Sequence, residues 1–196
     1  MALKHLSDRE LVEHYRRGNQ ASIETLINRH KNKVYTYILM TVKNTALAED
    51  IFQDTFIKVI QSLDTGRYQE NGRFLSWVIR IAHNLVIDHF RKQNQMNVSS
   101  NDDYENDLFN NARFSDQTVE EEIVRDQIHQ DVRKLIDTLP EEQKEVVILR
   151  HYVGLSFKEI AEQTHVSINT ALGRMRYALI NMRKMIRETN LNLTIQ

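Results

Sequence analysis

The 196-residue chain has no cysteine and only five scattered glycines. The lack of cysteine excludes a disulfide scaffold, a cysteine-based zinc site and a thiol nucleophile, and no glycine-rich phosphate loop is present. No apolar run approaches the roughly 18 residues of a transmembrane helix, and the N-terminal segment MALKHLSDRE lacks the apolar centre of a signal peptide. A hydrophobic content of 41% is sufficient for ordinary cores. We therefore expect a cytoplasmic protein of one or two modest domains, with no membrane insertion.

The only proline, Pro140, marks the most informative region of the chain, residues 139–184. Pro140 favours a helix start, and Gly154 is typical of the residue that ends a helix. Ser156 and Glu159 have the spacing of a capping box for a second helix, which can run to about residue 164. Ser167 can cap a third, longer helix. This pattern predicts a helix-turn-helix, which points to DNA binding.

The third helix of this motif has two distinct faces. Its apolar positions recur at the helical period and predict a core stripe of Ile168, Ala171, Met175, Leu179, Met182 and Ile186. The opposite face has side chains that can bind base edges or phosphates, namely Asn169, Thr170, Gly173, Arg174, Tyr177 and Lys184, with Arg176 at the margin. An ordinary solvated helix face is the alternative, which the two capped helices before it disfavour.

The formal net charge of -1 conceals an uneven distribution. Residues 1–92 hold 14 Lys and Arg against 10 Asp and Glu, residues 93–139 hold 4 against 11, and residues 140–196 hold 8 against 6. Two mildly basic blocks thus flank an acidic middle. This asymmetry favours two DNA-facing domains joined by a segment that avoids DNA or imitates it. Residues 93–117 are rich in Asn, Asp and Ser and predict a flexible acidic linker, whereas a helical pattern resumes at 118–137.

The first 92 residues contain almost only helix signals. Ser7 and Glu10 form another capping box, and breaks are expected at residues 18–19 and 44–45. The segment 46–63 carries an inner stripe, while its outer face shows Asp50, Gln53, Asp54 and Lys58. A polar loop at 64–73 precedes a last helix over 74–92. We therefore expect an all-α fold of two small helical domains, 1–92 and 118–196, joined by the linker 93–117.

The last of these helices is apolar on two sides, which predicts that it is wedged between neighbours. The remaining narrow strip comprises Ser76, Arg80, His83, Asn84, Asp88 and Arg91. A strip of arginine and asparagine suits nucleic acid. Surface charges kept for solubility are the alternative explanation of this strip.

Two segments together resemble the sigma-70 family of RNA polymerase sigma factors, in its small two-domain extracytoplasmic-function (ECF) group. The N-terminal part is similar to domain two of that group through ALAEDIFQDTFIKVIQSL and GRFLSWVIRIAHNLVIDHFRK. The C-terminal part is similar to domain four through LPEEQKEVVILRHYVGLSFKEIAEQTHVSINTALGRMRYAL. The resemblance implies a transcription initiation factor that binds core RNA polymerase, recognises the minus-10 and minus-35 promoter elements and assists promoter opening. A factor of this kind is expected not to be an enzyme and to need no metal or cofactor.

The resemblance also implies roles for particular residues. Contacts to the core polymerase, at the coiled coil of its largest subunit, are expected from Asp50, Gln53, Asp54 and Phe56, and the flap region is a further expected contact. The loop and the helix after it are expected to capture a flipped base and hold the minus-10 strand through Tyr68, Asn71, Arg73, Trp77, Arg80, Asn84 and Arg91. The minus-35 element is expected to contact Ser167, Asn169, Thr170, Arg174, Arg176 and Tyr177. An anti-sigma factor is a further expected partner.

The chain departs from the family pattern at several positions of the helix-turn-helix. Leu172 stands where many relatives have a basic residue, and Tyr177 stands where they often have arginine. His165 replaces the usual glycine of the turn, and it tolerates a positive φ less well than glycine does. Gly173 lies in the middle of a helix, where it either allows DNA to approach the backbone closely or reflects drift.

Other functions remain to be compared with this expectation. A transcription regulator with a similar C-terminal motif would need a sensing or receiver domain, usually α/β, and no alternating strand pattern appears. A di-metal helical bundle would need inward Glu-x-x-His pairs on its helices, and the one Glu-x-x-His spacing in the sequence, Glu162 to His165, runs into the expected turn of the helix-turn-helix. For the acidic linker two roles stay open: occupation of a basic polymerase channel, as in the family, or a solvated tether.

Overall fold

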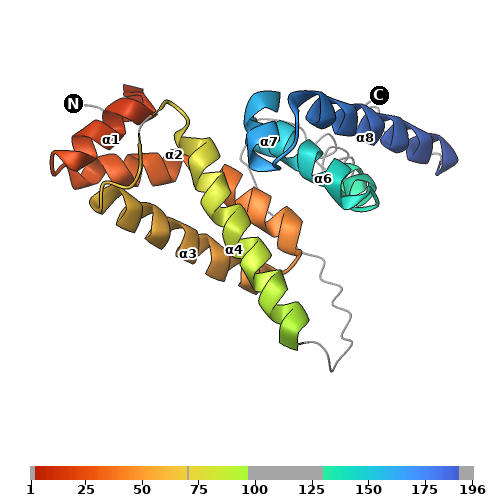
Figure 1. Ribbon diagram of the computed structural model, residues 1–196, viewed down its shortest axis with the longest axis horizontal. Helices are drawn as coiled ribbons and strands as arrows, with labels where there is room; N and C mark the ends of the chain where they lie inside the picture. Colours follow the sequence, from red (N-terminus) through yellow and green to blue (C-terminus); the bar gives the residue numbers. More distant parts are fainter. Residues whose placement is uncertain (1–2, 70, 97–129, 190–196) are drawn as a thin grey trace, which may run out of the picture. The chain divides into compact units, whose positions relative to one another are not determined.

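A computed structural model describes residues 3–69, 71–96 and 130–189 of the chain. The segment 97–129, with most of the expected linker and of the helical pattern at 118–137, lies outside these residues. The chain divides into two compact units, Met1–Asp107 and Leu108–Gln196, which we describe separately (Figure 1). The described residues contain helices and no strand, which confirms the all-α prediction for this part of the chain. None of their helices is long and apolar enough to cross a membrane.

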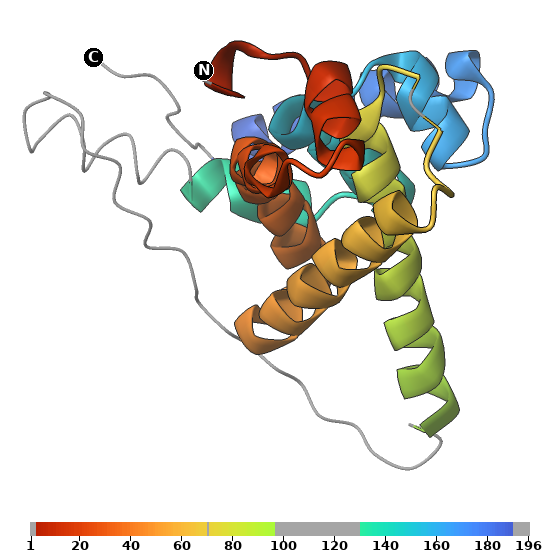
Figure 2. The same ribbon diagram turned by 90° about the vertical axis from the view of Figure 1, so that its left-hand side faces the viewer.

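The N-terminal unit is a helical bundle, which Figures 1 and 2 show from two sides. Its elements are a short 3-10 helix η1 (Leu3–His5) and the helices α1 (Asp8–Arg16), α2 (Gln20–Val42), α3 (Thr45–Asp64) and α4 (Phe74–Met96). The predicted capping box of Ser7 and Glu10 is present at the start of α1. Asn44 caps α3 through its side chain, which accepts a hydrogen bond from the backbone N–H of Leu47. These local caps place the breaks where the sequence predicts them.

Helices α2, α3 and α4 pack against one another, and α1 covers α2. Their buried faces form the core of the N-terminal unit, in which the side chains of Leu11, Val12, Leu26, Val34, Ile38, Val59, Val78 and Ile79 are almost completely inaccessible. Burial of this apolar area is the main stabilising contribution. The inner stripe expected for residues 46–63 is confirmed at Ile51, Thr55, Val59 and Leu63.

The polar strip predicted for α4 is partly wrong. Ser76 is buried, and His83 is half-buried with its Nδ1 2.9 Å from the hydroxyl of Tyr37 on α2. A buried polar group needs such a partner. The partner lies 46 residues away in the chain, so helical periodicity alone does not reveal it. Arg80, Asn84 and Arg91 are exposed, as expected.

The C-terminal unit contains the predicted helix-turn-helix. Residues 130–137 are helical and are followed by α6 (Glu141–Val147), the π-helical turn η2 (Ile148–Val153), α7 (Phe157–Gln163) and α8 (Ile168–Glu188) (Figure 1). Pro140 is the residue before α6, and Gly154 ends η2 with a φ of 88°. The capping box of Ser156 and Glu159 and the cap at Ser167 are both confirmed. His165 adopts a φ of 54° in the turn.

Helices α6 and α7 both pack on α8. The Nδ2 of Asn181 on α8 donates a hydrogen bond of 2.8 Å to Oε1 of Gln143 on α6. The predicted core stripe of α8 is wrong at Ile168 and Leu179, which are exposed, whereas Ala171, Met175 and Ala178 are buried. The buried positions on α8 are thus two alanines and one methionine, because small side chains allow a neighbouring helix to approach closely.

Candidate polymerase and nucleic-acid interfaces

The outer face of α3 carries the acidic and amide side chains that the sequence predicts there. Asp50, Gln53 and Asp54 are all exposed. Ile57 is 52% exposed and lies one helical turn beyond Gln53 and Asp54 on the same face. Ile57 is not among the residues predicted for the outer face of this helix, although its position three residues after Asp54 indicates the same face. We call the surface formed by these four side chains the α3 face.

Phe56 does not belong to this face, because only 6% of it is exposed. Its ring lies 4.9 Å from the ring of Phe52, which in turn contacts Tyr35 on α2 at a centroid distance of 5.8 Å. Phe56 therefore fixes α3 against the bundle, and the side chain itself is turned away from solvent. A direct contact from Phe56 to a partner would require a rearrangement of this core.

The loop 64–73 covers an aromatic cluster. Tyr68 is only 3% exposed, and its ring lies 4.3 Å from that of Trp77 and 5.8 Å from that of Phe74. Phe74 and Trp77 also contact each other, at 5.7 Å. Tyr68 was expected to contact a flipped base, but here it anchors the loop to α4, and Trp77 is half-buried beneath it. The aromatic rings stabilise the conformation of the loop through tilted and edge contacts.

Helix α1 contacts the last residue of α3 and the loop that follows it. The hydroxyl of Tyr15 donates a hydrogen bond of 2.6 Å to Oδ1 of Asp64, and the guanidinium of Arg16 donates one to the carbonyl oxygen of Tyr68. The hydrogen bond to Asp64, together with burial and the Asp64 charge, raises the pKa of Tyr15 to about 12. Farther along, Oδ1 of Asn71 accepts a hydrogen bond of 3.2 Å from the backbone N–H of Arg73. These contacts pre-organise the loop.

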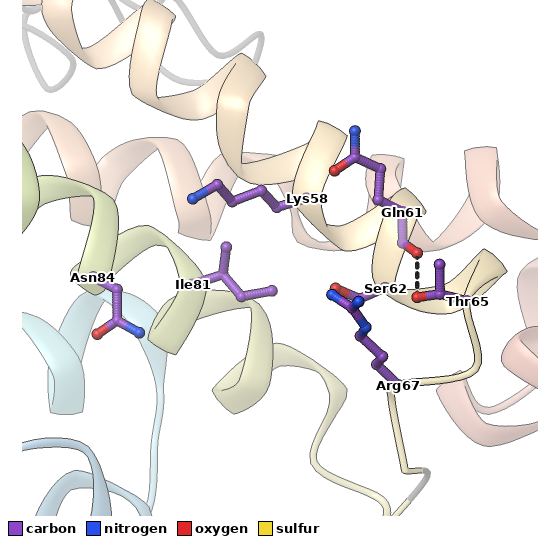
Figure 3. A pocket seen from close by; sticks show the side chains of 7 residues that line it. All are labelled: Lys58, Gln61, Ser62, Thr65, Arg67, Ile81 and Asn84. Carbon is purple, nitrogen blue, oxygen red and sulfur yellow. Dashed lines mark hydrogen bonds between the residues drawn. The ribbon is translucent and has the colours of Figure 1, made fainter.

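A pocket of about 510 Å³ lies where α3, the loop and α4 meet (Figure 3). Figure 3 shows the polar ends of Lys58, Arg67 and Asn84 around Ile81, and the pocket is completed by Gln61, Ser62 and Thr65. The hydroxyl of Thr65 donates a hydrogen bond of 2.7 Å to the carbonyl of Gln61, which fixes the end of α3. Two cations, amides and an apolar side chain are suited to a phosphate with its attached base.

The outer strip of α4 continues from this pocket. Arg80, Asn84 and Arg91 are exposed at intervals of about one or two turns. Arg91 also forms an ion pair of 2.8 Å with Asp88, which is an exposed pair of small energetic value. Ile87 is 50% exposed and lies between Asn84 and Arg91 on this strip, a position that the sequence analysis overlooked.

On α8, some predicted DNA-contact residues are exposed and others are engaged within the unit. Asn169, Arg176 and Tyr177 are exposed. The hydroxyl of Ser167 accepts the backbone N–H of Thr170 at 3.0 Å and lies 2.8 Å from the Thr170 hydroxyl. Both hydroxyls thus serve the helix cap, although they remain exposed.

Arg174 is the least accessible of the predicted DNA-contact residues on α8. Its side chain is 19% exposed, and its Nη2 lies 3.2 Å from Oε2 of Glu142 on α6. Burial and the neighbouring charge of Glu141 raise the pKa of Glu145, while Arg174 acts to lower it. The positive charge of Arg174 therefore helps to compensate two carboxylates of α6, those of Glu142 and Glu145.

Apolar residues complete the outer face of α8. Leu172 is 44% exposed, and Asn169 and Arg176 lie one turn before and after it. A side chain added at Gly173 would meet no atom within 4 Å, and its backbone is not left-handed. Neither packing nor backbone conformation thus requires glycine there. In the described residues, no group of three or more His, Asp or Glu side chains is placed to hold a metal ion.

A chain whose described residues form helices, with a helix-turn-helix in one unit and an arginine and asparagine strip in the other, belongs to the class of nucleic-acid-binding proteins. Comparison with known proteins defines the family. Residues 26–96 match the model of Sigma-70 region 2, and residues 129–176 match that of Sigma-70 region 4.

Similar proteins over nearly the whole chain bear sigma-factor names. RNA polymerase sigma factor CarQ of Myxococcus xanthus is 30% identical, with 93% of this chain and 99% of CarQ covered. RNA polymerase sigma-H factor of Pseudomonas aeruginosa is 28% identical, with 86% and 88% covered. The ECF RNA polymerase sigma-E factor of Haemophilus influenzae is also 28% identical, with 93% and 95% covered.

Solved structures show the same fold. The sigma factor RpoE of Bartonella quintana, in complex with the anti-sigma factor NepR, superposes with a TM-score of 0.68 at 19% identity, covering 84% of this chain and 96% of that chain. CnrH, in complex with the cytosolic domain of CnrY, gives 0.62 at 20% identity and covers 92% and 97%. The chain belongs to the sigma-70 family, in its ECF group, and is a transcription initiation factor rather than an enzyme.

Proposed function

We propose that this chain brings core RNA polymerase to promoters by a division of labour between its two units. Residues 1–92 dock on the polymerase and hold the opened minus-10 element, and residues 118–196 read the minus-35 element in duplex DNA. Residues 93–117 connect the two activities. The observation that carries the proposal is the presence of three exposed polar surfaces, on α3, α4 and α8, within the two regions that match the family models.

The α3 face is the proposed contact to the polymerase. Its carboxylates and amide, Asp50, Gln53 and Asp54, are complementary to a basic helix such as the coiled coil of the largest subunit. Ile57 adds an apolar centre, which is typical of residues that contribute most to a protein interface. Phe56 supports this face from within the core.

The pocket and the α4 strip are the proposed site for the minus-10 strand. Arg67 and Lys58 line the pocket, where they attract a phosphate, and Asn84 offers an amide to a base edge. Arg80 and Arg91 extend the same charge along α4, while Asn71 and Arg73 lie in the loop before it. A flipped base costs a few kcal/mol of unstacking, and a preformed loop reduces the additional cost of ordering the protein.

The N-terminal half of α8 is the proposed reader of the minus-35 element. In a helix-turn-helix, these residues face the base edges of the major groove. Asn169 suits adenine, and Arg176 suits guanine or a phosphate. Ser167 and Thr170 hold the start of the helix, where the backbone N–H groups favour a phosphate. Arg174 orients α8 on α6 through its ion pair with Glu142.

Run-off transcription tests this proposal. Core polymerase with the full-length chain is expected to produce discrete start sites from a pool of promoter fragments, and the double variant Asp50→Lys, Asp54→Lys is expected to abolish them because it reverses the charge of the α3 face. Glu24→Lys, an exposed charge reversal on α2, is the matched control and should retain the start sites. DNA binding without any polymerase-dependent transcript would instead support a transcription regulator.

Two further parts of the proposal concern partners and location. An anti-sigma factor is a proposed regulator, by analogy with RpoE and CnrH, whose structures contain the partners NepR and CnrY. A pull-down with the full-length chain in the presence and absence of core polymerase tests whether such a partner competes for the α3 face.

The flap region is a second proposed polymerase contact, and the proposed location is the cytoplasm.

A further inference from the structure

The outer face of α8 is unusual for a DNA-reading surface, because its centre is apolar and partly without side chains. Leu172 is 44% exposed on this face, between Asn169 and Arg176. Gly173 lies beside it, with open space around the position that a Cβ would occupy. An exposed leucine leaves apolar surface in water, and a mid-helix glycine destabilises the helix relative to alanine. Both residues are therefore candidates for a functional role.

The chemistry of these two positions matches one base. Thymine is the DNA base that presents a methyl group in the major groove, and apolar side chains recognise that methyl. Leucine offers two methyl groups and no hydrogen-bonding group. The missing side chain at Gly173 allows the duplex to approach the helix backbone, since glycine is typical of positions where another group comes close. Close approach is what a short leucine side chain needs in order to reach a base edge.

We propose that Leu172 reads the 5-methyl group of a thymine in the minus-35 element and that Gly173 provides the clearance for this contact. The inference rests on the proposed function of α8 and adds a sequence preference to it. Asn169 and Arg176, one turn away on either side, contact the neighbouring base pairs. The minus-35 element of this protein thus contains a thymine whose methyl group, rather than its hydrogen-bonding edge, is recognised.

Methyl deletion in the DNA tests the contact. Holoenzyme with the full-length chain is bound to a promoter that it transcribes, and each thymine of the minus-35 element is replaced in turn by deoxyuridine, which lacks only the methyl group. Loss of one buried methyl group is expected to weaken binding about fourfold at one position. Leu172→Ala is expected to weaken binding similarly and to be insensitive to deoxyuridine there, which is the signature of direct coupling. Ile180→Ala, an exposed apolar residue two turns farther along α8, should keep the deoxyuridine penalty.

Substitution of Gly173 tests the proposed clearance independently of Leu172. Gly173→Ala is expected to raise the melting temperature of the C-terminal unit and at the same time to weaken binding to the minus-35 element, whereas a glycine with no role in DNA binding would give the higher melting temperature with unchanged binding. A deoxyuridine penalty that persists in Leu172→Ala, or holoenzyme that initiates at discrete sites with no penalty at any thymine, overturns this inference alone. Holoenzyme that initiates nowhere overturns the proposed function and the inference with it.

Discussion

The candidate DNA surface of the N-terminal unit is cationic, whereas that of the C-terminal unit is largely uncharged. Arg67, Arg80 and Arg91 are exposed around the pocket and along α4. On the first turns of α8, the charge of Arg174 is paired with Glu142. Arg176 is exposed there, and its exposed neighbours Leu172 and Tyr177 are uncharged.

The difference in charge between the two surfaces matches the two forms of DNA that they are proposed to bind. An opened strand has flexible phosphates and is held by charge, while duplex DNA presents a fixed pattern of base edges and methyl groups. Total charge does not reveal this difference, because the blocks 1–92 and 140–196, which contain these surfaces, are both mildly basic. What distinguishes them is which cations the fold leaves exposed.

The largest effect is expected from the aromatic cluster that supports the loop. Phe74→Ala removes a ring that is 1% exposed and should lower the free energy of unfolding of the N-terminal unit by about 3–5 kcal/mol. Urea unfolding followed by tryptophan fluorescence measures this directly, since the single tryptophan, Trp77, lies in the same unit. Ile57→Ala on the α3 face is the control and should change stability by no more than about 0.5 kcal/mol. Equal losses from the two variants would contradict the assignment of the core.

The next largest effect is expected in the affinity for the minus-10 strand and in the dependence of that affinity on salt concentration. Arg80→Ala with Arg91→Ala removes two proposed contacts to the minus-10 strand, each worth about 1.5 kcal/mol or more as a charged hydrogen bond, so affinity should fall on the order of a hundredfold. The slope of log K against log salt should decrease by about 1.4 for a single strand. Binding of holoenzyme to a promoter opened in advance by mismatches measures both values. Lys31→Ala on α2 is the matched control. A slope change equal to that of the control would contradict the proposal that Arg80 and Arg91 bind the phosphates of the minus-10 strand.

The two units should also respond in opposite directions to acid. Burial raises the pKa of Asp8, but the hydrogen bonds and charges of His30 and Arg29 outweigh it and hold this pKa below its ordinary value. The contribution of Asp8 to stability is therefore present above its ordinary pKa and lost as the pH falls through the lowered one. Glu145 has a raised pKa, chiefly through burial, so its contribution is present below its ordinary pKa and lost as the pH rises through the raised one.

Amide hydrogen exchange separates these responses, because it reports each helix individually. Asp8→Asn should reduce the acid sensitivity of α1 and α2, and Glu145→Gln should reduce the pH dependence of α6 and α8. If the pH dependence of exchange is unchanged in both variants, groups other than Asp8 and Glu145 determine the pH dependence of stability. Tyr15 adds a third dependence: with its pKa raised to about 12, its contribution is full below its ordinary value and lost as the pH rises toward 12.

The smallest effect is expected at the ion pair between α6 and α8. Glu142→Gln removes a partly exposed pair and should cost less than about 1 kcal/mol of stability. It also releases the guanidinium of Arg174, so binding to the minus-35 element should become slightly tighter and more salt-dependent. Measured affinities of the wild type and the variant at two salt concentrations test this. Weaker binding in Glu142→Gln would mean that the pair positions α8 for DNA.

The comparison also explains which features the sequence could predict. The caps at Ser7, Ser156 and Ser167 were predicted correctly, because a cap depends on residues within three positions of one another. The order and approximate bounds of the helices followed from the same local signals. Exposure of Asp50 and Asp54 followed from helical periodicity.

Features that depend on distant residues were not predictable in this way. Tyr68 looks like an exposed loop residue in the sequence, but its partners on α1 and α4 bury it. Leu179 looks like a core residue by periodicity, yet it is exposed and the neighbouring Ala178 is the buried residue where α6 and α7 pack on α8. The ion pair of Arg174 joins residues 32 positions apart, since 174 minus 142 is 32. Each of these requires the packing of helices that are separate in the chain.

The π-helical turn at Ile148–Val153 determines where the chain can gain or lose a residue without disturbing its core. At the end of this turn the backbone N–H of Gly154 reaches back five residues to the carbonyl of Leu149, at 3.1 Å, and the N–H of Leu155 bonds the same carbonyl at 3.0 Å. A turn with i→i+5 bonds holds one residue more than an α-helical turn, so it is the site where a one-residue insertion can be absorbed. Loss of one residue there would restore an uninterrupted α-helix, whereas the same loss within α7 would rotate Ile160 away from the core. Single-residue length differences among homologous chains should therefore be concentrated at this turn.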